Sequence, residues 1–327
     1  MSFVVEGFVI IEETKRNITN MKEFHLSLPA TSANLGPAFD TAALALDLSL
    51  RINASKAKQY SILASGRDSE ICGQVENHLI LTTYGEVLQA EGKNHVPLAL
   101  KIKNEFPIGR GCGSSAAARL AGIALAVHFG KLRWNSSRII GEASRRERHS
   151  DNAAACWMGG VTVSRMRADG EAQVERFLPK GKWPLLLAIA DESLSTEKAR
   201  EVLPRHYSRH DVVANIQNSM LLLAALFQGD QKLLASALED RIHQPYRAPL
   251  SPLLPALKYF PEGKGVLGAV LSGAGPSVLM FLDAGTSPER TKARVADHLR
   301  KSGMQAELVL TSIAKRGGEV SFLRGSR

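Results

Sequence analysis

The sequence predicts an α+β protein of two domains, on three observations. Strand-like and helix-like segments mix along the chain without the regular strand–helix alternation of a doubly wound parallel sheet. The length of 327 residues exceeds that of one ordinary domain. A stretch rich in proline, glycine and lysine at 180–184 separates two parts. We therefore expect an N-terminal extension at 1–22, an N-terminal domain at 23–183 and a C-terminal domain at 184–327.

Period-two alternation of apolar and polar residues predicts the strands of the first domain. Phe24–Leu28 suits a short strand, and the residues from Pro29 to Pro37 are expected to form a loop. Leucine and isoleucine alternate with other residues from Leu44 to Ile52, and a similar pattern runs from Leu98 to Lys103. These patterns indicate half-buried strands, with one face on a core.

The second domain is expected to begin with a strand at Leu185–Ala190. Two more strand-like runs, Val266–Leu271 and Val278–Leu282, flank a glycine-rich loop. The run Ser287–Glu289 supplies an N-cap, a first-position proline and a first-turn acid for a helix that ends near Gly303. Helices are also expected at Asp211–Phe227, Gln231–Ile242 and Pro249–Tyr259.

Composition and charge exclude several classes of protein. The chain is 44% hydrophobic and 22% charged, which is typical of a globular protein. Apolar runs such as Met220–Phe227 are far shorter than the ~20 residues of a membrane span. No basic region or small-residue cleavage site opens the chain, so we expect no signal peptide. The 3 cysteines lack paired spacing and fit a reducing cytoplasm.

The formal net charge of +9 leaves the kind of partner open. A net positive charge of this size is compatible with binding to nucleic acid, with binding to a small anionic ligand, or with no specific partner at all. Aromatic residues make up only 6% of the chain and do not interleave with basic clusters as a stacking surface requires. The one dense cluster, at Arg145–Arg148, is short. We therefore expect neither nucleic acid nor a membrane as partner.

The segment Pro107–Ala117 has the composition of a phosphate-binding loop. It joins a predicted strand to a proline-free run of Ala, Leu and Val from Ser115 to Phe129, which reads as a buried helix closed by Gly130. Its glycines let the backbone approach a ligand, and unpaired N–H groups at the helix start attract an anion. Its spacing matches neither a Walker loop nor a dinucleotide fingerprint. Read alone, it could also be a glycine-rich turn before a core helix.

Two more loops carry small polar residues or glycine between predicted strands. The first, Pro29–Asp40, ends in an aspartate that could simply cap a turn. The second, Leu271–Ser277, is long for a simple hairpin and rich in backbone donors. Each loop is moderate evidence by itself, and the three together are much stronger.

The three loops resemble the motifs of the GHMP kinases, a family of small-molecule kinases that includes galactokinase, homoserine kinase and mevalonate kinase. The glycine-rich segment is similar to the family's P-x-x-x-G-L-G-S-S-A-A, with Cys112 in place of leucine. The resemblance implies a two-domain α+β fold, with a ribosomal-protein-S5-like N-terminal domain and a ferredoxin-like C-terminal domain. It also implies an ATP-binding segment that consists of Pro107, Ile108, Gly109, Arg110, Gly111, Cys112, Gly113, Ser114, Ser115 and Ala116.

Further segments resemble the homoserine kinases within that family. They are the first loop, Glu147–Asn152 with the following Gly159-Gly160, Leu194–Pro204, and His243–Arg247. Homoserine is a zwitterion, whose carboxylate suits arginine and whose ammonium group needs acceptors. The resemblance implies an acceptor pocket that consists of Asn34, Asp40, His149, Thr196, Arg200, Arg247 and Gly273. Read alone, an arginine here could be a solvated surface residue and the histidine a structural one.

The resemblance also implies how phosphoryl transfer is assisted. The reaction needs charge neutralisation and in-line positioning more than covalent chemistry. Ser115 and Glu147 would ligate Mg²⁺, with Glu142 as an alternative to Glu147, because magnesium prefers a few oxygen ligands. Asp151 stands where mevalonate kinase has its general base, and it either acts as a base or only positions groups. Asn152 is expected to help position the phosphate.

The sequence departs from the homoserine kinase motifs at four positions. Ala38 replaces a glycine, Ala42 and Ala43 replace Leu-Gly, and Ser150 replaces a proline. A glycine that adopts a positive φ resists replacement by alanine, so the acceptor loop could differ in shape. These departures bear on acceptor specificity more than on kinase activity.

The expected function is ATP-dependent phosphorylation of the side-chain hydroxyl of L-homoserine to O-phospho-L-homoserine, a step of threonine biosynthesis. ATP and Mg²⁺ are the expected cofactors, the cytoplasm is the expected location, and the resemblance also points to a homodimer. Alternatives are another GHMP kinase with a mevalonate-like acceptor, a kinase fold that only binds its ligand, and a basic nucleic-acid-binding protein.

Overall fold

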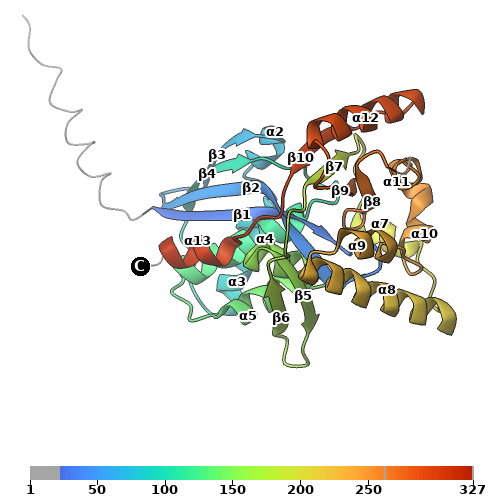
Figure 1. Cartoon of the computed structure of the whole chain (residues 1–327). Coiled ribbons are helices and arrows are strands. Elements are labelled where there is room, and N and C mark those ends of the chain that lie inside the picture. Colours follow the sequence, from blue (N-terminus) through green and yellow to red (C-terminus); the bar gives the residue numbers. More distant parts are fainter. Residues whose placement is uncertain (1–22, 261–262, 326–327) are drawn as a thin grey trace, which may run out of the picture.

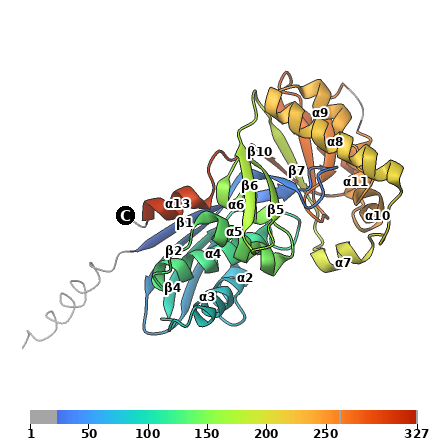
Figure 2. The same cartoon turned by 90° about the horizontal axis from the view of Figure 1, so that it is seen from below.

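The computed structural model describes residues 23–260 and 263–325, which form two sheets covered by helices (Figure 1). The expected N-terminal extension at 1–22 lies outside the described residues. Each sheet belongs to one lobe of the molecule, and the two lobes lie side by side (Figure 2). Within the described residues, no helix has both the length and the apolar character needed to cross a membrane.

The first sheet is built around one long central strand. Its six strands are β1 (Phe24–Ala33), β2 (Ala42–Lys56), β3 (Ser61–Gly66), β4 (Leu98–Asn104), β5 (Val161–Met166) and β6 (Ala172–Phe177). They run in the order β3-β4-β2-β5-β6, and β1 also pairs with β2. The 15 residues of β2 pair with β1, and separately with β4 near one end and with β5 near the other. The pair β3–β4 is parallel, and the other pairs are antiparallel.

Helix α4 forms the centre of the first domain. The helices here are α2 (Ser69–Cys72), α3 (Leu79–Ala90), α4 (Ser114–Phe129), α5 (Ser136–Glu147) and α6 (Asp151–Met158). The small side chains of α4 allow close packing against α3, since a Cβ atom on Gly122 would lie 2.5 Å from the carbonyl oxygen of Ile80. The predicted buried helix from Ser115 to Phe129 is confirmed to within one residue.

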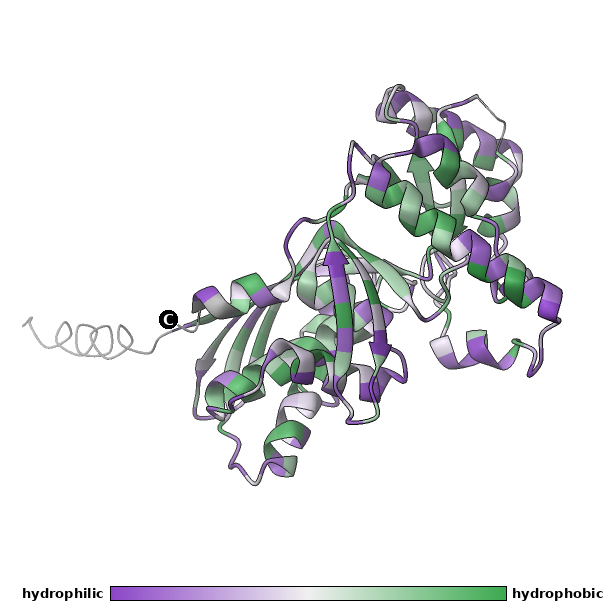
Figure 3. Ribbon diagram, turned by 60° about the horizontal axis from the view of Figure 1, so that its bottom comes forward, coloured by the Kyte–Doolittle hydropathy of each residue, from purple (hydrophilic) through white to green (hydrophobic). Residues whose placement is uncertain are grey.

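The second sheet confirms the expected ferredoxin-like arrangement. Its strands are β7 (Leu185–Ile189), β8 (Val266–Leu271), β9 (Val278–Leu282) and β10 (Glu307–Thr311). All neighbouring strands are antiparallel, and their order across the sheet is β10-β7-β9-β8. Numbered along the chain within this domain, that is the order 4-1-3-2. Every residue of β7 and β9 is buried, and these strands are hydrophobic almost throughout (Figure 3).

Helices of the second domain cover this sheet and approach the first domain. They are α7 (Thr196–Glu201), α8 (Arg209–Gln228), α9 (Gln231–Ala237), α10 (Gln244–Arg247), the 3-10 turn Ala248–Leu250, α11 (Leu253–Lys258) and α12 (Pro288–Lys301). The predicted start of α12 is confirmed, because the side chain of Ser287 accepts a hydrogen bond from the N–H of Arg290.

The expected strand Phe24–Leu28 was too short. In the structure β1 continues through the residues that were expected to begin a loop, and Ala30 pairs with Leu46 after an irregularity at Pro29. The small residues of this stretch show no alternation, because both of their faces are buried. The pairing with β2 therefore decides the conformation.

Two expected helices in the second domain differ from the structure: one ends early and the other is divided. Helix α9 stops at Ala237, well before Ile242, because the carboxylate of Asp240 accepts hydrogen bonds from three N–H groups that follow it. The expected helix Pro249–Tyr259 is divided at Ser251, where φ is −142° and the hydroxyl donates to the carbonyl of Pro276. In the first case local hydrogen bonds to a side chain replace helical ones, and in the second a tertiary hydrogen bond accompanies the break.

The C-terminal helix returns to the first domain. Helix α13 (Gly318–Gly325) lies beside β1 in Figure 1, and its Phe322 ring lies 6.1 Å from Phe24 and 5.6 Å from Trp157. The domain division at 183/184 stays a prediction. The last helix of the expected C-terminal domain (184–327) packs on the N-terminal domain. There it covers β1, a strand that pairs with β2 alone among the described strands and so has a free edge.

Candidate active site

The three loops selected from the sequence lie against one another. The N–H of Thr31 in the first loop donates to the carbonyl of Cys112 in the glycine-rich loop, at 3.1 Å. The hydroxyl of Ser272 in the third loop donates to the carbonyl of Gly111, at 2.6 Å. The side chain of Asn34 donates to the carbonyl of Gly273, at 2.7 Å. These bonds join the three loops into one structure between the two domains.

The glycine-rich loop needs its glycines for conformation and for space. Gly109, Gly111 and Gly113 have φ values of 71°, 79° and 69°, in the left-handed region. A Cβ atom on Gly113 would lie 1.9 Å from the hydroxyl of Thr31, and one on Gly111 would lie 2.2 Å from a carbonyl oxygen. Helix α4 begins directly afterwards, so its unpaired N–H groups and positive dipole end face a cavity of about 90 Å³.

A hydroxyl and a carboxylate meet at the edge of this cavity. The hydroxyl of Ser115 donates to Oε1 of Glu147 at 2.6 Å, and Nε of Arg119 donates to the same oxygen at 2.5 Å. Both Ser115 and Glu147 line the cavity. This pair of oxygen donors fits Mg²⁺, which takes few protein ligands and completes its shell with phosphate and water. Sequence reasoning missed Arg119, which lies one helical turn beyond Ser115 in α4 and belongs to no motif used above.

The alternative ligand Glu142 is engaged elsewhere. Its carboxylate accepts hydrogen bonds from Arg145 at 2.9 Å and from Arg146 at 2.8 Å. It does not line the cavity beside Ser115. The geometry therefore favours Glu147. Among the residues that the structure describes, no group of three or more His, Cys, Asp or Glu side chains is arranged to hold a metal ion.

A larger cavity of about 490 Å³ adjoins the same helix start. Gly109, Ser114 and Ser115 line one end of it. The apolar part of the remaining walls comes from β2, β4, α2, α3 and the segment after β4; it includes Leu50, Ile71, Ile80, Ile102 and Phe106. The loop between α2 and α3 adds polar residues, among them Gln74 and Asn77. The volume lies in the range of small-molecule sites. Sequence reasoning missed this cavity, because its residues come from separate elements and carry no common motif.

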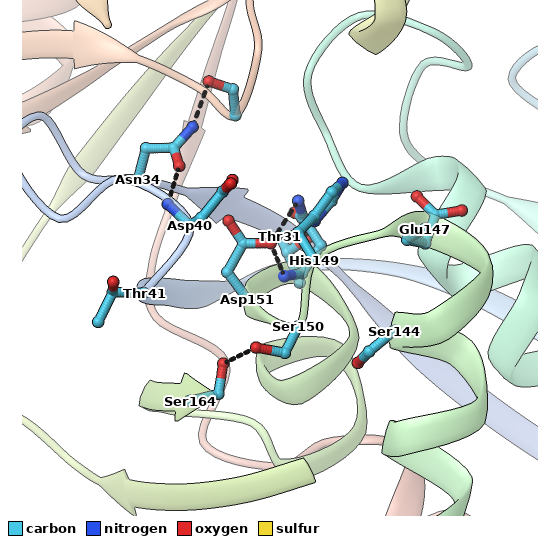
Figure 4. Close-up of polar contacts among 12 residues, drawn as sticks. Thr31, Asn34, Asp40, Thr41, Ser144, Glu147, His149, Ser150, Asp151 and Ser164 are labelled. Atoms are coloured by element: carbon cyan, nitrogen blue, oxygen red, sulfur yellow. Dashed lines mark hydrogen bonds and ion pairs between the residues drawn. The ribbon is translucent and has the colours of Figure 1, made fainter. Parts of the chain in front are cut away.

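The predicted acceptor residues converge on a small cavity of about 30 Å³. Seven predicted residues line it: Asn34, Asp40, His149, Thr196, Arg200, Arg247 and Gly273. The catalytic candidates Asp151 and Asn152 line it as well, and several of these side chains point toward one another in Figure 4. His149, Asn152, Thr196 and Gly273 also line the cavity at the glycine-rich loop. The two cavities therefore adjoin each other.

Two acceptor-site residues of opposite charge bind each other. Nη2 of Arg200 lies 2.6 Å and 2.8 Å from the two carboxylate oxygens of Asp40. Both side chains are about one-third exposed, at 32%. The resemblance assigns Asp40 to an ammonium group and Arg200 to a carboxylate. A zwitterion that enters the cavity can replace each partner of this ion pair with its own group of matching charge.

Arg247 is a buried cation. Its relative exposure is 1%, its Nε donates to the carbonyl of Ala199 at 2.9 Å, and its guanidinium lies 5.1 Å from the ring of Phe39. Burial and the nearby charge of Arg200 lower the pKa of Arg247 to about 10, so it stays charged at neutral pH. In the described part of the chain, no carboxylate forms an ion pair with it. The charges of Asp40 and Asp240 lie near it and favour its cation, but neither bonds to it directly. A buried guanidinium without a bonded carboxylate suits an anionic ligand.

His243 holds the Arg247 side chain in place. Its Nε2 lies 2.8 Å from the carbonyl of Gly36, so this nitrogen carries the proton, and Nδ1 accepts from Nη1 of Arg247 at 3.3 Å. Burial lowers the pKa of His243, which keeps the ring neutral. The Phe39 ring stacks on the imidazole at 5.1 Å. No role was predicted for His243 or Phe39, although both lie inside motifs that resemble those of the family.

The catalytic candidates form a short network. Oδ1 of Asp151 accepts hydrogen bonds from Nδ1 of His149 at 2.7 Å and from the N–H of Asn152 at 2.6 Å. Oδ1 of Asn152 accepts from the hydroxyl of Thr31 at 2.6 Å. Burial lowers the pKa of His149, but the hydrogen bond and charge of Asp151 outweigh this effect and raise it. Asp151 therefore favours the protonated form of the His149 ring, and the role of Asp151 as base or positioning group stays a prediction.

Two of the departures from the motifs, Ala38 and Ser150, fit the local geometry. Ala38 does not adopt a positive φ, so alanine meets no strain there. The left-handed residues of this loop are instead Asn34, Gly36 and Asp40, together with the neighbouring leucine. The hydroxyl of Ser150 forms a hydrogen bond with that of Ser164, at 2.9 Å (Figure 4). Replacement of glycine by alanine at position 38 therefore does not change the shape of the acceptor loop through backbone strain.

The chain matches a known protein family in both of its domains. Residues 78–160 match the GHMP kinases N terminal domain, and residues 222–303 match the GHMP kinases C terminal domain. The chain is 41% identical to a homoserine kinase of Solibacter usitatus over 301 residues, which cover 91% of this chain and 97% of that protein. It therefore belongs to the GHMP kinase family.

Within this family, homoserine kinases are among its relatives. A homoserine kinase of Deinococcus radiodurans is 33% identical over 288 residues, which cover 88% of this chain and 94% of that protein. The structure of a homoserine kinase from Cytophaga hutchinsonii aligns with a TM-score of 0.75 at 20% identity, covering 97% and 99% of the two chains. A phosphomevalonate kinase of Streptococcus pneumoniae aligns at 0.64 with 17% identity, covering 90% and 99%. Kinases of different acceptors thus share the fold, which by itself does not decide the acceptor.

Proposed function

We propose that the protein is a homoserine kinase, which transfers the γ-phosphoryl group of ATP to the side-chain hydroxyl of L-homoserine. The observation that carries this proposal is the buried guanidinium of Arg247, with the carboxylate of Asp40 in the same cavity. A pocket with both charges recognises a small zwitterion. The relatives named as homoserine kinases support the same acceptor.

ATP would occupy the two cavities that meet at the start of α4. The apolar cavity of about 490 Å³ is large enough for the nucleoside, and the N–H groups at the glycine-rich loop would hold the phosphates. Ser115 and Glu147 would hold Mg²⁺. When bound, the ion supplies charge neutralisation for the phosphate oxygens.

Homoserine would bind by replacing the Asp40–Arg200 ion pair. Its ammonium group would take the place of Arg200 at the carboxylate of Asp40. Its carboxylate would then lie between Arg200 and Arg247. Since the cavity has a volume of only about 30 Å³, Arg200 and its short helix α7 must move outward to admit the acceptor.

The acceptor hydroxyl would then lie near the junction of the two cavities. Its oxygen forms a bond to the γ-phosphorus as the bond from that phosphorus to the bridging oxygen of ADP breaks. Asp151 lines this junction on the acceptor side, where it either receives the hydroxyl proton or orients the hydroxyl. Asn152 and Thr196 line both cavities and would position the reacting groups.

An acceptor screen tests the proposal. Release of ADP is measured by a coupled assay with L-homoserine, mevalonate and shikimate at equal concentrations. Two analogues of homoserine test the charge recognition: 4-hydroxybutyrate, which lacks the ammonium group, and 3-amino-1-propanol, which lacks the carboxylate. We expect turnover of homoserine far above that of all the others. Turnover of mevalonate without turnover of homoserine would favour the alternative kinase activity.

We also place the reaction in the cytoplasm. Cys72, Cys112 and Cys156 are all free thiols and all buried. Burial raises the pKa of Cys112 to about 12, so this thiol beside the phosphate loop stays protonated and unreactive. Free thiols suit a reducing compartment in which ATP is available.

A further inference from the structure

The turn between β3 and α2 contacts the first part of the glycine-rich loop. Asp68 lies in this turn with a φ of 51° and a ψ of 33°, in the left-handed region. It directly precedes α2, where an aspartate normally accepts a hydrogen bond from the first N–H groups of the helix. Its carboxylate makes no such bond, and Oδ2 instead accepts from the N–H of Ile108, at 2.8 Å. The side chain thus connects two separate elements.

This hydrogen bond joins two parts of the wall of the apolar cavity of about 490 Å³. Ile108 and Gly109 contribute to that wall from the glycine-rich loop, whereas Ile71 and Cys72 contribute from α2. Because α2 begins at the residue after Asp68, a shift of Asp68 moves α2 as well. The bond therefore fixes the separation between the loop and α2 at this cavity.

A buried amide strengthens the same junction. Nδ2 of Asn104, a residue that is only 2% exposed, donates to the carbonyl of Arg67 at 3.0 Å and to that of Phe106 at 2.8 Å. The N–H of Arg67 donates back to the carbonyl of Asn104, at 2.8 Å. A Cβ atom on Gly66 would lie 2.2 Å from that carbonyl oxygen, so the turn lies close against β4. Buried polar contacts of this kind hold the turn and the start of the loop together.

An ion pair connects this turn to the second sheet. Nη1 and Nη2 of Arg67 donate to the two carboxylate oxygens of Glu307, at 2.7 Å and 2.5 Å. Glu307 is the first residue of β10 and lies 240 residues further along the chain. The hydrogen bond with Arg67 lowers the pKa of Glu307, and the charges of Arg110 and Lys292 act in the same direction. The two parallel hydrogen bonds fix the direction as well as the distance of this contact.

We propose that Asp68 is a positioning residue for the nucleotide, and that the Arg67–Glu307 ion pair holds it in place. Asp68 contacts no substrate and acts through the N–H of Ile108. Only residues 109–113 separate Ile108 from the first residue of α4, so the position of Ile108 determines where the phosphate-binding N–H groups lie. This inference rests on the proposed function, because it assigns the apolar cavity to the nucleoside of ATP.

Titration with a fluorescent ATP analogue, without acceptor, tests the role of Asp68. We expect Asp68→Gly to raise the Kd about 10-fold, because glycine keeps the left-handed conformation but supplies no hydrogen-bond acceptor. Asp68→Asn should stay within about threefold of the unaltered protein, since asparagine tolerates this conformation and keeps a side-chain oxygen. The matched control is Asp169→Gly, because Asp169 also accepts from a backbone N–H, that of Glu171 at 3.0 Å, but lies in an exposed hairpin. This control should leave the Kd unchanged.

Steady-state kinetics separate positioning from a general loss of structure. We expect Asp68→Gly to raise the KM for ATP about 10-fold and to change the KM for homoserine less than about twofold. Equal increases in both constants, or an equal loss of binding in Asp68→Asn and Asp68→Gly, would contradict the positioning role. An unaltered protein that binds no ATP analogue would overturn the proposed function as well. Tight binding by both the unaltered protein and Asp68→Gly would overturn the role of Asp68 alone.

A double-mutant cycle tests the contribution of the ion pair. We expect Arg67→Met and Glu307→Gln each to raise the Kd of the ATP analogue about threefold, as suits a partly exposed pair. The double variant should show the same increase as either single one, because each substitution already removes the whole interaction. Singles without effect, or a double variant whose increase is the product of the two, would show that the pair does not hold Asp68.

Discussion

At the scale of single residues, the acceptor site depends on buried charge and on how that charge is held. Arg247 has a neutral histidine and a backbone carbonyl as partners, whereas Arg200 has a carboxylate. The first arginine is therefore available to an anion without the loss of an existing ion pair. The second has to exchange partners. Under the proposed function, we therefore expect Arg247 to contribute the larger share of carboxylate binding.

Replacement of Arg247 tests this assignment. We expect Arg247→Leu to raise the KM for homoserine at least about 10-fold, because a charge-assisted hydrogen bond contributes ~1.5–3 kcal/mol. The KM for ATP should change less than about twofold, because Arg247 does not line the cavities proposed for ATP and no hydrogen bond to ATP is lost. Steady-state kinetics with each substrate varied in turn measures both constants. Arg241→Leu, which removes a nearby arginine paired with Asp211, is the control and should leave both unchanged. A similar loss of ATP affinity in Arg247→Leu would contradict the assigned role.

At the scale of elements, three loops and one helix form the proposed phosphate site. The glycine-rich loop bends through its left-handed residues so that α4 begins facing the cavity. Contacts from β1 and from the β8–β9 loop hold it there. Its shape is therefore sensitive to any added atom at the contact points.

Gly113→Ala should disable this loop while the rest of the fold persists. The new Cβ atom would lie 1.9 Å from the hydroxyl of Thr31, so the loop or β1 must shift. We expect kcat/KM for ATP to fall about 100-fold, the usual consequence of a 1 Å displacement at a reacting centre. Gly92→Ala is the matched control, because Gly92 has a similar φ of 62° but open space around it. Equal losses in both variants would indicate backbone strain and not a lost phosphate site.

At the scale of the whole molecule, the two domains are joined by more than the chain connection at 183/184. Helix α13 packs on β1 and α6 after the chain has completed the second sheet. The basic cluster near Arg145 also has a structural use, since Arg145 and Arg146 pair with Glu142, and Arg146 pairs with Glu86 as well. Part of the positive charge of the chain thus stabilises the first domain.

Phe322 anchors α13 to the first domain. We expect Phe322→Ala to lower the free energy of unfolding by about 3 kcal/mol, because the ring is buried against Phe24 and Trp157. Urea titration followed by circular dichroism measures the change. Tyr259→Ala removes a ring that is 77% exposed and should cost less than about 0.5 kcal/mol. Equal effects of the two substitutions would show that α13 contributes little to stability.

The sequence predicted most elements with a clear period or a clear cap. The buried helix α4, the capped start of α12 and the hydrophobic strands β8 and β9 match their expected bounds closely. Elements without such signals were missed, among them the edge strand β3 and the hairpin β5–β6. In β3 and β6 most residues are exposed or half-buried, and in β5 buried polar residues alternate with apolar ones, so none shows a clear apolar pattern. Pairing with neighbouring strands, and not local pattern, decides their conformation.

By itself, the sequence determined the kinase loops, their order and the residue types of the proposed acceptor site, because recognition of phosphate and carboxylate needs particular local groups. Only the tertiary structure decided how these groups are used. It placed Glu147 rather than Glu142 beside Ser115, paired Asp40 with Arg200, and buried Arg247 against His243. These outcomes depend on contacts between residues distant in the chain. Local pattern carries no information about which distant partner will be nearest when the two domains fold.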